Sequence, residues 1–402
     1  YLRGGRVRTQ KKVSVLVLIV GIALFGLGLL GWLMGDLNLE SLRPIAAEVY
    51  AARVEARSFE IPITGTVDLF GEGRGTVPIK LLSSVMNNAI IIMIVGIALV
   101  FNAIMLRIQS WESMKDLFCV QPALFFFMLF VYFPVIDLVR ISLTDMRMLV
   151  TDPQKFIGLR NYQWLFLQSG WNRFSESLLI TARYTFWELF ITLVGGLLLA
   201  LLFNRMNRTF NAMRAVVFMP KYIAVATSAV VFIWILHGNY GILNYALSLF
   251  GIRGPNWLVQ GNTALYGVLI LTMWRVVGYA MMIYLSAMQG IPKDYYEAAE
   301  IDGADSVQRL RFITLPMLAP TSLFLFVTTF IASMKVFQSV DVMTGGGPGT
   351  ATNVVVQWIY NLSFKDFRAA RSAAVSVIFF VILLVCTAAT MMWSNKSVSY
   401  DS

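Results

Sequence analysis

The feature that most constrains this 402-residue chain is a series of apolar stretches, each about 20 residues long. A helix of that length crosses a hydrocarbon layer roughly 30 Å thick while satisfying its own backbone hydrogen bonds. Because 58% of the residues are hydrophobic and only 13% are charged, the chain lacks the polar side chains that a soluble domain needs to cover itself. The sequence therefore predicts an all-α membrane protein.

Eight such stretches can be placed as transmembrane helices. They cover residues 12–34, 86–106, 118–141, 178–203, 215–236, 265–288, 317–340 and 373–393. The apolar core of the first is too long for a cleaved signal peptide, so we expect a retained anchor helix. An even number of spans puts both termini on one side, and the distribution of Lys and Arg indicates that this side is cytoplasmic.

The predicted spans divide the chain into five parts. These are residues 1–35 with the first span, an outer loop at 36–85, residues 86–117 with the second span, a six-helix core at 118–394, and an inner tail at 395–402. Within the outer loop, residues 39–57 can form an amphipathic helix and 59–70 a strand that enters a hairpin. A small external subdomain and a spacer without function both remain open for this loop.

Sites for catalysis or cofactors are not evident in the sequence. His237 is the only histidine, so no zinc cluster based on histidine can be built. The phosphate-binding pattern Gly-x-x-x-x-Gly-Lys-Ser/Thr is absent, so we expect the chain to bind no ATP by itself. The net charge of +10 comes without a basic run beside an aromatic-rich soluble face, which argues against nucleic-acid binding.

The most informative segment is the polar interruption between the sixth and seventh spans, from Glu297 to Pro316. Pro292 can begin a helix there, residues 295–301 can continue it, and Gly303 can end it. Small residues in such a helix allow close approach and suit docking into a groove on another protein. The residue types alone are equally compatible with an ordinary amphipathic connector.

This interruption resembles the signature of the permease subunits of binding-protein-dependent ABC importers. The matching residues are Glu297, Ala298 and Ala299, then Gly303 after three residues, and Ile313, Leu315 and Pro316 after nine more. Weaker motifs at 156–162, 199–205, 302–304 and 344–348 resemble the carbohydrate branch, which includes maltose, multiple-sugar and glycerol-phosphate permeases. The resemblance implies the type I ABC importer transmembrane fold, with two extra N-terminal helices and a coupling loop at 290–316.

The resemblance also implies a function. Such a permease carries a sugar or oligosaccharide, delivered by a periplasmic or extracellular solute-binding protein, across the bacterial inner membrane. The seven signature residues would couple it to two cytoplasmic ATP-binding-cassette subunits, which bind the ATP and Mg and do the hydrolysis. The further partners implied are a second permease subunit, the solute-binding protein and membrane lipid. The chain itself would be no enzyme and would hold no cofactor.

The resemblance places the solute path near the membrane midplane, between the fourth to seventh spans and the second permease. By alignment with the maltose-permease pattern, the candidate residues are Thr272, Val276 and Tyr279 on one helical stripe, and Thr329, Ser333 and Val336 on another. Thr and Ser in membrane helices more often serve helix packing than ligand binding.

Charged residues inside the spans form a second group of candidates, because each costs several kcal/mol unless it is paired or hydrated. They are Arg183, Glu188, Lys221, Arg275 and Lys335. Arg183 and Glu188 lie about one turn apart, and we expect them to pair. Lys221 and Arg275 lie beside the expected sugar contacts, which suggests an acidic substrate such as a uronate-containing or phosphorylated sugar.

Three other classes compete with this interpretation. A permease for a non-sugar solute would carry the same signature. An ion-coupled secondary transporter would need inverted repeats and broken helices, neither of which is visible in the sequence. A membrane enzyme is disfavoured because no nucleophile–base pair or metal cluster can be assembled.

Overall fold

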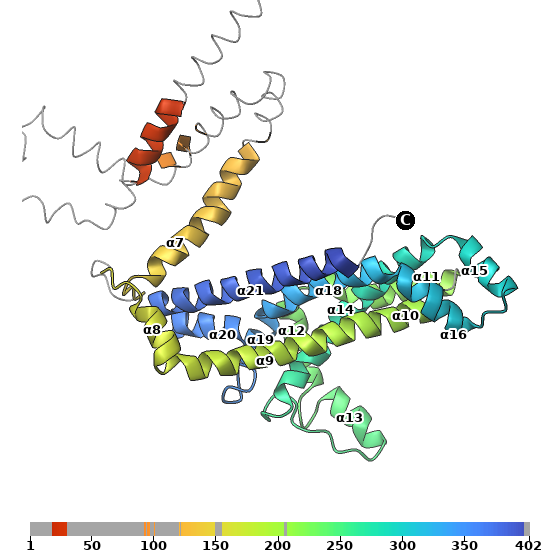
Figure 1. The fold of residues 1–402 in the computed structure, drawn as a ribbon. Coiled ribbons are helices and arrows are strands. Elements are labelled where there is room, and N and C mark those ends of the chain that lie inside the picture. Colours follow the sequence, from red (N-terminus) through yellow and green to blue (C-terminus); the bar gives the residue numbers. More distant parts are fainter. Residues whose placement is uncertain are drawn as a thin grey trace, which may run out of the picture. The chain divides into compact units, whose positions relative to one another are not determined.

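The structure is a computed structural model. It describes residues 18–29, 92–93, 95–96, 100, 120, 122–148, 155–204 and 207–397, with side chains described up to residue 392. The chain divides into two units, Tyr1–Ile157 and Gly158–Ser402, each with its own internal contacts (Figure 1). The outer loop at 36–85 and most of the second predicted span lie outside the described residues.

The described part of the first unit is helical. A short apolar helix, Leu18–Leu29, lies within the first predicted span. A second helix, Pro122–Ser142, is long and apolar enough to cross a membrane, as the sequence predicts, and includes α7 (Phe133–Ser142). Its bulky side chains, among them Phe126, Phe130 and Ile136, are exposed. These faces suit contact with lipid or with another helix.

The second unit is built from helices throughout its described residues. They are α8 (Arg160–Leu167), α9 (Gly170–Phe190), η2 (Ile191–Gly195), α10 (Gly196–Leu202), α11 (Arg208–Phe218), η3 (Met219–Tyr222), α12 (Val225–Ile235), α13 (Ile242–Leu249), α14 (Ala264–Gln289), α15 (Lys293–Ile301), α16 (Ser306–Arg309), η4 (Leu310–Thr314), α17 (Leu315–Met317), α18 (Ala319–Met334), α19 (Gln338–Met343), α20 (Val355–Tyr360), η5 (Asn361–Lys365) and α21 (Ala369–Ser397).

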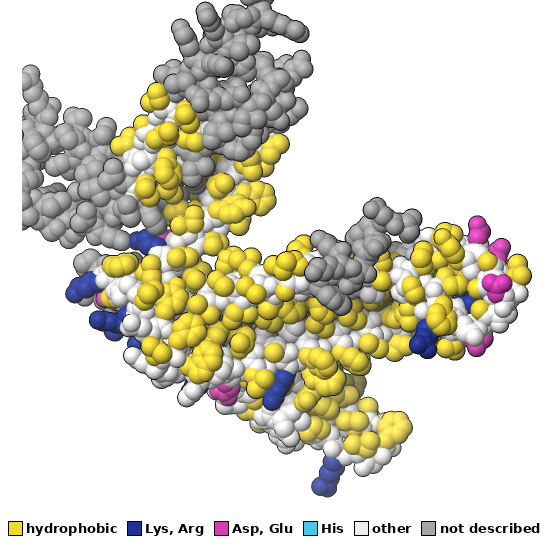
Figure 2. All heavy atoms as spheres, viewed as in Figure 1, with side chains coloured by type: hydrophobic (Ala, Val, Ile, Leu, Met, Phe, Trp, Pro, Cys, Tyr) yellow, Lys and Arg dark blue, Asp and Glu magenta, His cyan; other side chains and the backbone are white. Residues whose placement is uncertain are grey.

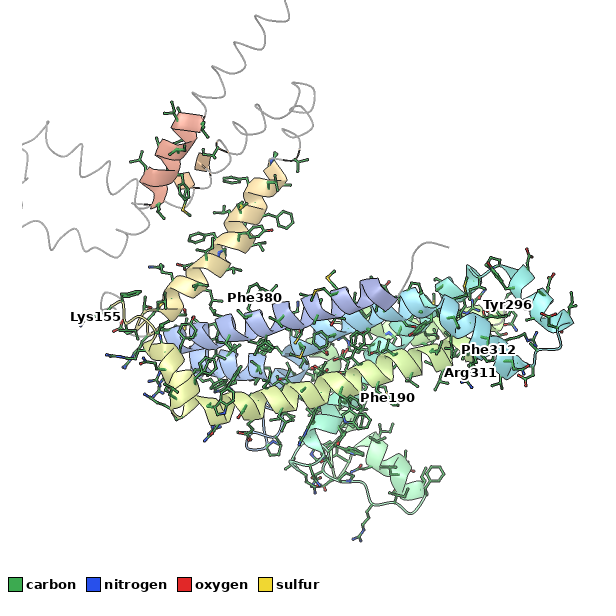
Figure 3. All side chains as sticks on the ribbon, in the orientation of Figure 1. Lys155, Phe190, Tyr296, Arg311, Phe312 and Phe380 are labelled. Carbon is green, nitrogen blue, oxygen red and sulfur yellow. The ribbon has the colours of Figure 1, made fainter. Side chains whose placement is uncertain are left out.

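Four continuous helices and two bent pairs account for up to six candidate membrane spans in the described residues. Helices α9, η2 and α10 form one span, Gly170–Leu202, and α14 is more deeply buried than the other continuous spans. The outward faces of α9 and α21 are apolar, with Phe190 and Phe380 exposed on them (Figure 3). A buried helix surrounded by helices with apolar outer faces is the arrangement expected in a bilayer.

Small residues bring α14 close to its neighbours. A Cβ atom on Gly196 of α10 would lie 2.5 Å from the Cβ of Ala280, and one on Gly278 would lie 1.9 Å from the carbonyl oxygen of Val217 in α11. Helices in membranes associate through such close packing, because apolar burial contributes little there. These glycines therefore set the distance between α14 and the helices that carry Lys221 and Glu188.

The predicted span at 215–236 is a bent helix pair rather than one straight helix. Helices α11 and η3 end at Tyr222, α12 begins at Val225, and the two directions differ by 104°. Pro220 lies in η3 just before the break, and proline lacks the N–H that would continue a helix. The carbonyl of Ile223 accepts a hydrogen bond from Arg275 Nη2 at 3.1 Å. The break is therefore stabilised by a side chain that the sequence places 52 residues away.

The predicted span at 317–340 is interrupted as well. Helix α18 ends at Met334, residues 335–337 are not helical, and α19 begins at Gln338. Lys335 therefore lies at a helix end rather than within a span. Non-helical backbone at membrane depth is tolerated where it lines a hydrated cavity. Because both breaks exist, a lack of broken helices is no argument against an ion-coupled transporter.

Candidate functional site

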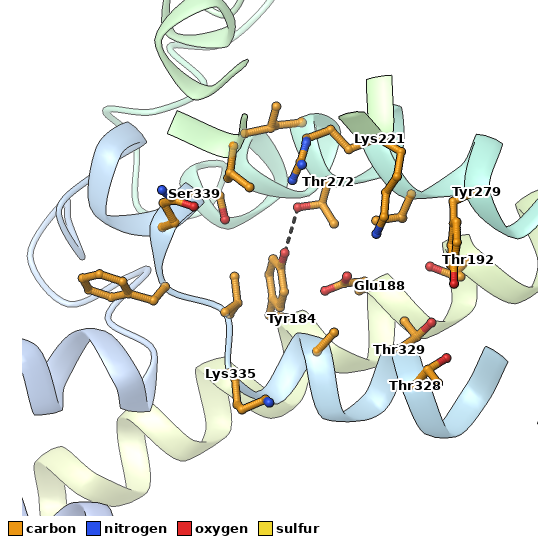
Figure 4. Close-up of a pocket in the computed structure, with 18 residues that line it drawn as sticks. Tyr184, Glu188, Thr192, Lys221, Thr272, Tyr279, Thr328, Thr329, Lys335 and Ser339 are labelled. Carbon is orange, nitrogen blue, oxygen red and sulfur yellow. Dashed lines mark hydrogen bonds between the residues drawn. The ribbon is translucent and has the colours of Figure 1, made fainter. Parts of the chain in front are cut away.

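A cavity of about 610 Å³ lies among α9, η3, α14, α18 and the segment that leads into α19 (Figure 4). Its polar lining side chains are Tyr184, Glu188, Thr192, Lys221, Thr272, Arg275, Tyr279, Thr328, Thr329, Lys335, Gln338 and Ser339. Both helix breaks contribute to the wall. The interruptions thus add polar groups to a site enclosed by apolar helices, and the cavity is large enough for a small organic solute.

Three cationic side chains line this cavity: Lys221, Arg275 and Lys335. Lys221 Nζ lies 4.6 Å from the centre of the Tyr279 ring, within range of a cation–π interaction. Arg275 donates through Nη2 to Ile223, while its Nε is buried without a hydrogen-bond partner. A buried donor without a partner is costly. Arg275 therefore has a donor left to offer to a bound group.

The cavity also contains a buried carboxylate, that of Glu188, which the sequence indicated only as a charged residue inside a span and as a partner for Arg183. Glu188 on α9 is 6% exposed, and its side chain points into the cavity (Figure 4). Lys221 and Arg275 are the cations whose charge acts on it. An acidic residue within a predicted span was the available signal.

The predicted pairing of Arg183 with Glu188 is wrong. Arg183 is exposed whereas Glu188 is buried. Five residues on a helix correspond to a rotation of about 140°, so the two side chains leave α9 on different faces. The residue that shares the face of Glu188 is Tyr184, one turn earlier, whose hydroxyl lies 2.7 Å from Thr272 Oγ1.

Most of the predicted path residues meet in the cavity wall. They are Lys221, Thr272, Arg275, Val276, Tyr279 and Thr329, and Val336 joins them. Ser333 does not: it is 1% exposed and donates to the carbonyl of Phe330. On α18 the cavity is lined by Thr328, Thr329 and Ala332, so Ala332 takes the place on the stripe that the sequence predicts for Ser333.

Several neutral polar residues were not singled out from the sequence. Tyr184, Thr192, Thr328 and Ser339 all line the cavity. The Oγ1 of Thr192 is buried without a partner, as is Arg275 Nε. A hydroxyl in a membrane helix looks the same in sequence whether it packs against a helix or faces a cavity, so no local signal could have identified them.

The predicted helix in the signature segment is confirmed. Helix α15 spans Lys293–Ile301 and follows Pro292. It ends in a Schellman motif, in which Ala304 N donates to Ala299 O at 2.8 Å and Gly303 N to Glu300 O at 3.1 Å. Gly303 has φ of 77°, a left-handed conformation that favours glycine. This position thus has a conformational reason for its residue type.

The signature residues divide into two groups. Glu297, Ala298 and Gly303 are exposed and Ala299 is half-buried, so the first group is accessible on and just after α15. Nothing lies within 4 Å of a Cβ atom built on Gly303. The second group, Ile313, Leu315 and Pro316, lies in η4 and α17 where the chain turns into α18. The first group lies on and just after α15, and the second lies at the base of a span, where Leu315 and Pro316 are exposed as well.

The surface around α15 carries both acidic and apolar side chains. Five carboxylates are exposed on it: Asp294, Glu297, Glu300, Asp302 and Asp305. Figure 2 shows acidic side chains gathered at this end of the molecule. Ile301 is 87% exposed and Val307 is 70% exposed. Apolar side chains left open among charges are typical of a protein interface.

Comparison with known proteins identifies the family. The model of the family "Binding-protein-dependent transport system inner membrane component" matches residues 192–398, a range that contains α15 and most of the cavity wall. The trehalose/maltose transport system permease protein MalF of Thermococcus litoralis is 30% identical over 288 residues, covering 71% of this chain and 95% of that protein. The sn-glycerol-3-phosphate transport system permease protein UgpA of Agrobacterium fabrum is 32% identical, covering 61% and 83%.

A solved structure has the same fold. It is a crystal structure of a bacterial ABC transporter involved in the import of the acidic polysaccharide alginate, and one of its chains aligns with a TM-score of 0.63 at 24% identity. The alignment covers 72% of this chain and 99% of that one. Taken with the family match, these findings show that the chain belongs to the inner membrane components of binding-protein-dependent transport systems: it is the multi-pass permease of an ABC importer and is not itself an enzyme.

Proposed function

We propose that this permease forms the membrane pathway for a sugar or oligosaccharide, and that the cavity between the two helix breaks is the site through which the solute passes. The observation that carries the proposal is the polar lining of this cavity, with two tyrosines and at least four hydroxyl side chains inside an apolar bundle. Sugars offer many hydroxyl groups together with apolar ring faces. Convergent polar groups and aromatic rings in an enclosed site suit such a ligand.

The named relatives support a carbohydrate cargo. One is a trehalose/maltose permease, and another is a permease for products of starch degradation in Thermoanaerobacterium thermosulfurigenes. A permease for a non-sugar solute is the alternative, since the family signature describes coupling and not cargo. An ion-coupled secondary transporter is disfavoured by the family match.

Within the sugars, we propose an acidic one. Lys221, Arg275 and Lys335 face the cavity, and Glu188 is the one carboxylate among its lining residues, so basic side chains outnumber acidic ones there by three to one. The buried Nε of Arg275 has no hydrogen-bond partner among the described residues. Carboxylate, phosphate and sulfonate groups all match a guanidinium beside an ammonium group. The structural neighbour that imports an acidic polysaccharide is in keeping with this proposal.

We base the proposed assembly on the exposed face of α15. Two ATP-binding-cassette subunits, which hold the ATP and Mg, would dock there, and the acidic surface favours a basic counterpart on them. A second permease subunit would complete the pathway, and an extracytoplasmic solute-binding protein would deliver the sugar. With α15 at the cytoplasmic face, the eight-span arrangement places both termini in the cytoplasm, with the first two spans as additions to the type I core.

The experiment that tests this function is solute-stimulated ATP hydrolysis by the complete transporter in lipid vesicles. Two disaccharides of the same size and linkage are compared, one with a uronic acid ring and one with the corresponding neutral ring. Each is added together with the binding protein encoded beside the permease. Stimulation by the uronate alone supports the acidic sugar, stimulation by the neutral sugar alone restricts the proposal to carbohydrates, and stimulation by amino acids or ions in place of both overturns it.

A further inference from the structure

The hydroxyls of Tyr296 and Thr314 lie 3.0 Å apart and join α15 to the base of α18. Tyr296 is half-buried beside Glu297, and it stands with α15 at the end of the molecule shown in Figure 3. Thr314 is 4% exposed and ends η4. Its hydroxyl also lies 3.4 Å from the carbonyl of Arg309. The contact closes the polypeptide from α15 to η4 into a ring.

Among the described residues, two polar side-chain contacts join α15 to the chain that follows it. The second is the ion pair of Glu300 and Arg309 at 3.5 Å, in which the side chain of Glu300 is 73% exposed. Exposed ion pairs contribute little, because water screens them and two long side chains must be ordered. The contact of Tyr296 with buried Thr314 is therefore the stronger of the two.

Thr314 lies just before the bend that leads into α18. Its carbonyl accepts from Leu318 N at 3.0 Å, and the chain bends by 60° between Met317 and Ala319. Helix α18 then runs to the cavity, where Thr329 and Ala332 form part of the wall. A displacement of α15 reaches this bend through two routes, the covalent chain around α16 and the direct Tyr296–Thr314 contact.

We propose that the Tyr296–Thr314 hydrogen bond is a strut that passes motion of α15 to α18, with Tyr296 as a positioning residue for coupling. The inference rests on the proposed docking of ATPase subunits on α15. Residues on the exposed face of α15, such as Glu297, would meet the partner, while Tyr296 on the inner face connects the helix to the span. Without the strut, α15 is connected to α18 only through the covalent chain and the exposed ion pair. ATP binding to the partner subunits then changes the conformation of the cavity less.

The test uses the assembled transporter in lipid nanodiscs and needs no identified solute. Cys119 and Cys386 are replaced by Ala, and Ala332→Cys places a thiol in the cavity wall. The reaction rate of this thiol with a charged thiol reagent is measured without nucleotide and with ATP, Mg and orthovanadate. We expect nucleotide to change the rate in the parent, and Tyr296→Phe and Thr314→Val each to reduce that change about three- to ten-fold, the factor that one net hydrogen bond contributes. ATP hydrolysis continues in both variants.

Matched controls separate a strut from a general loss of structure. Thr314→Ser keeps the hydroxyl and should behave as the parent, as should Tyr295→Phe on the neighbouring exposed tyrosine. The double variant Tyr296→Phe with Thr314→Val should be no worse than Thr314→Val alone, because that change already removes the shared contact. Parent-like responses in the single variants, or additive losses in the double variant, would overturn the strut.

The proposed function has its own readout in the same experiment. Glu297→Lys is expected to prevent the ATPase subunits from copurifying, which tests docking independently of Tyr296. Copurification and full nucleotide response in Glu297→Lys would count against α15 as the docking site, whatever the strut variants do. If nucleotide does not change the reaction rate of the cavity thiol in the parent transporter, the proposed function and the strut are both overturned.

Discussion

The hydroxyl of Tyr184 on α9 lies 2.7 Å from that of Thr272 on α14, and both residues are buried. This contact holds together the two helices that carry Glu188 and Arg275, one turn further along each. The acidic and basic walls of the cavity are thereby kept at a defined separation. In a membrane interior such interhelical hydrogen bonds contribute a modest stabilisation, of about 1 kcal/mol.

Replacing Arg275 should weaken both the site and the helix break. We expect Arg275→Leu to reduce uronate-stimulated ATP hydrolysis at least about ten-fold, because the charged partner of a buried anion contributes roughly 1.5–3 kcal/mol. Arg275→Lys keeps the charge and should retain more stimulation. The ATPase rate of the transporter in vesicles is the measurement. Unchanged stimulation in Arg275→Leu would rule out an acidic substrate held by this residue.

Lys221 offers a cleaner test of charge, since the contact of its ammonium group in the described part of the chain is with the Tyr279 ring. Lys221→Met keeps the apolar stem and removes the ammonium group. We expect a several-fold higher uronate concentration at half-maximal ATPase stimulation, in line with a loss of about 1 kcal/mol for a partly hydrated cation. Lys221→Arg is the control and should stay close to the parent. A neutral sugar should stimulate ATP hydrolysis equally in the parent and in Lys221→Met.

Glu188→Gln should strengthen the binding of an acidic substrate, in contrast to Lys221→Met. The change removes the carboxylate that faces Lys221 and Arg275 while nearly preserving its shape. We expect the half-maximal uronate concentration to fall about three- to ten-fold, because the anion no longer competes with an internal negative charge. The change should shrink as ionic strength rises. Tighter binding of the neutral disaccharide in the same variant would contradict this electrostatic explanation.

Larger or oppositely charged side chains on the exposed face of the coupling segment should prevent uptake. Glu297→Lys and Gly303→Asp are expected to abolish uptake while the protein remains in the membrane. For Gly303 we expect two causes: its left-handed backbone strains any other residue type, and a side chain there would protrude toward the partner, since a Cβ atom meets no described atom within 4 Å. Uptake by whole cells and the membrane level of the permease are the measurements. Gly303→Asn, which also adopts left-handed backbone, separates charge from volume: loss in both variants indicates volume.

Gly278 should be required for packing. A Cβ atom there would lie 1.9 Å from the carbonyl oxygen of Val217, a backbone atom that cannot move aside easily. We expect Gly278→Ala to destabilise the protein by about 1–3 kcal/mol, the usual cost of overpacking. Gly195→Ala is the control, because its Cβ would meet the Val277 side chain at an ordinary 3.6 Å. Thermal unfolding of the two variants in detergent should differ by several degrees, and equal unfolding temperatures would argue against this close approach.

Much of the fold followed from the sequence because hydrophobic length is a direct physical requirement of a bilayer. The helices at 122–142, 264–289 and 369–392 agree with the predicted spans to within a few residues. The helix α15 and its end at Gly303 followed from local chemistry, since capping depends on neighbouring residues alone. The breaks at residues 223 and 335 could not be predicted from the sequence, because the hydropathy along both predicted spans is continuous. The backbone groups that each break exposes are satisfied by a distant helix or by a cavity.

By itself the sequence determined that this chain crosses the membrane, belongs with importer permeases and presents a coupling helix, since these properties reside in contiguous residues. Only the tertiary structure decided which intramembrane side chains meet. It placed Glu188 in one cavity with Lys221 and Arg275 and away from Arg183, excluded Ser333 from the cavity, and brought Tyr296 to Thr314. The physical reason is that the face on which a side chain leaves its helix depends on rotation, and rotation is set by packing at positions such as Gly196 and Gly278.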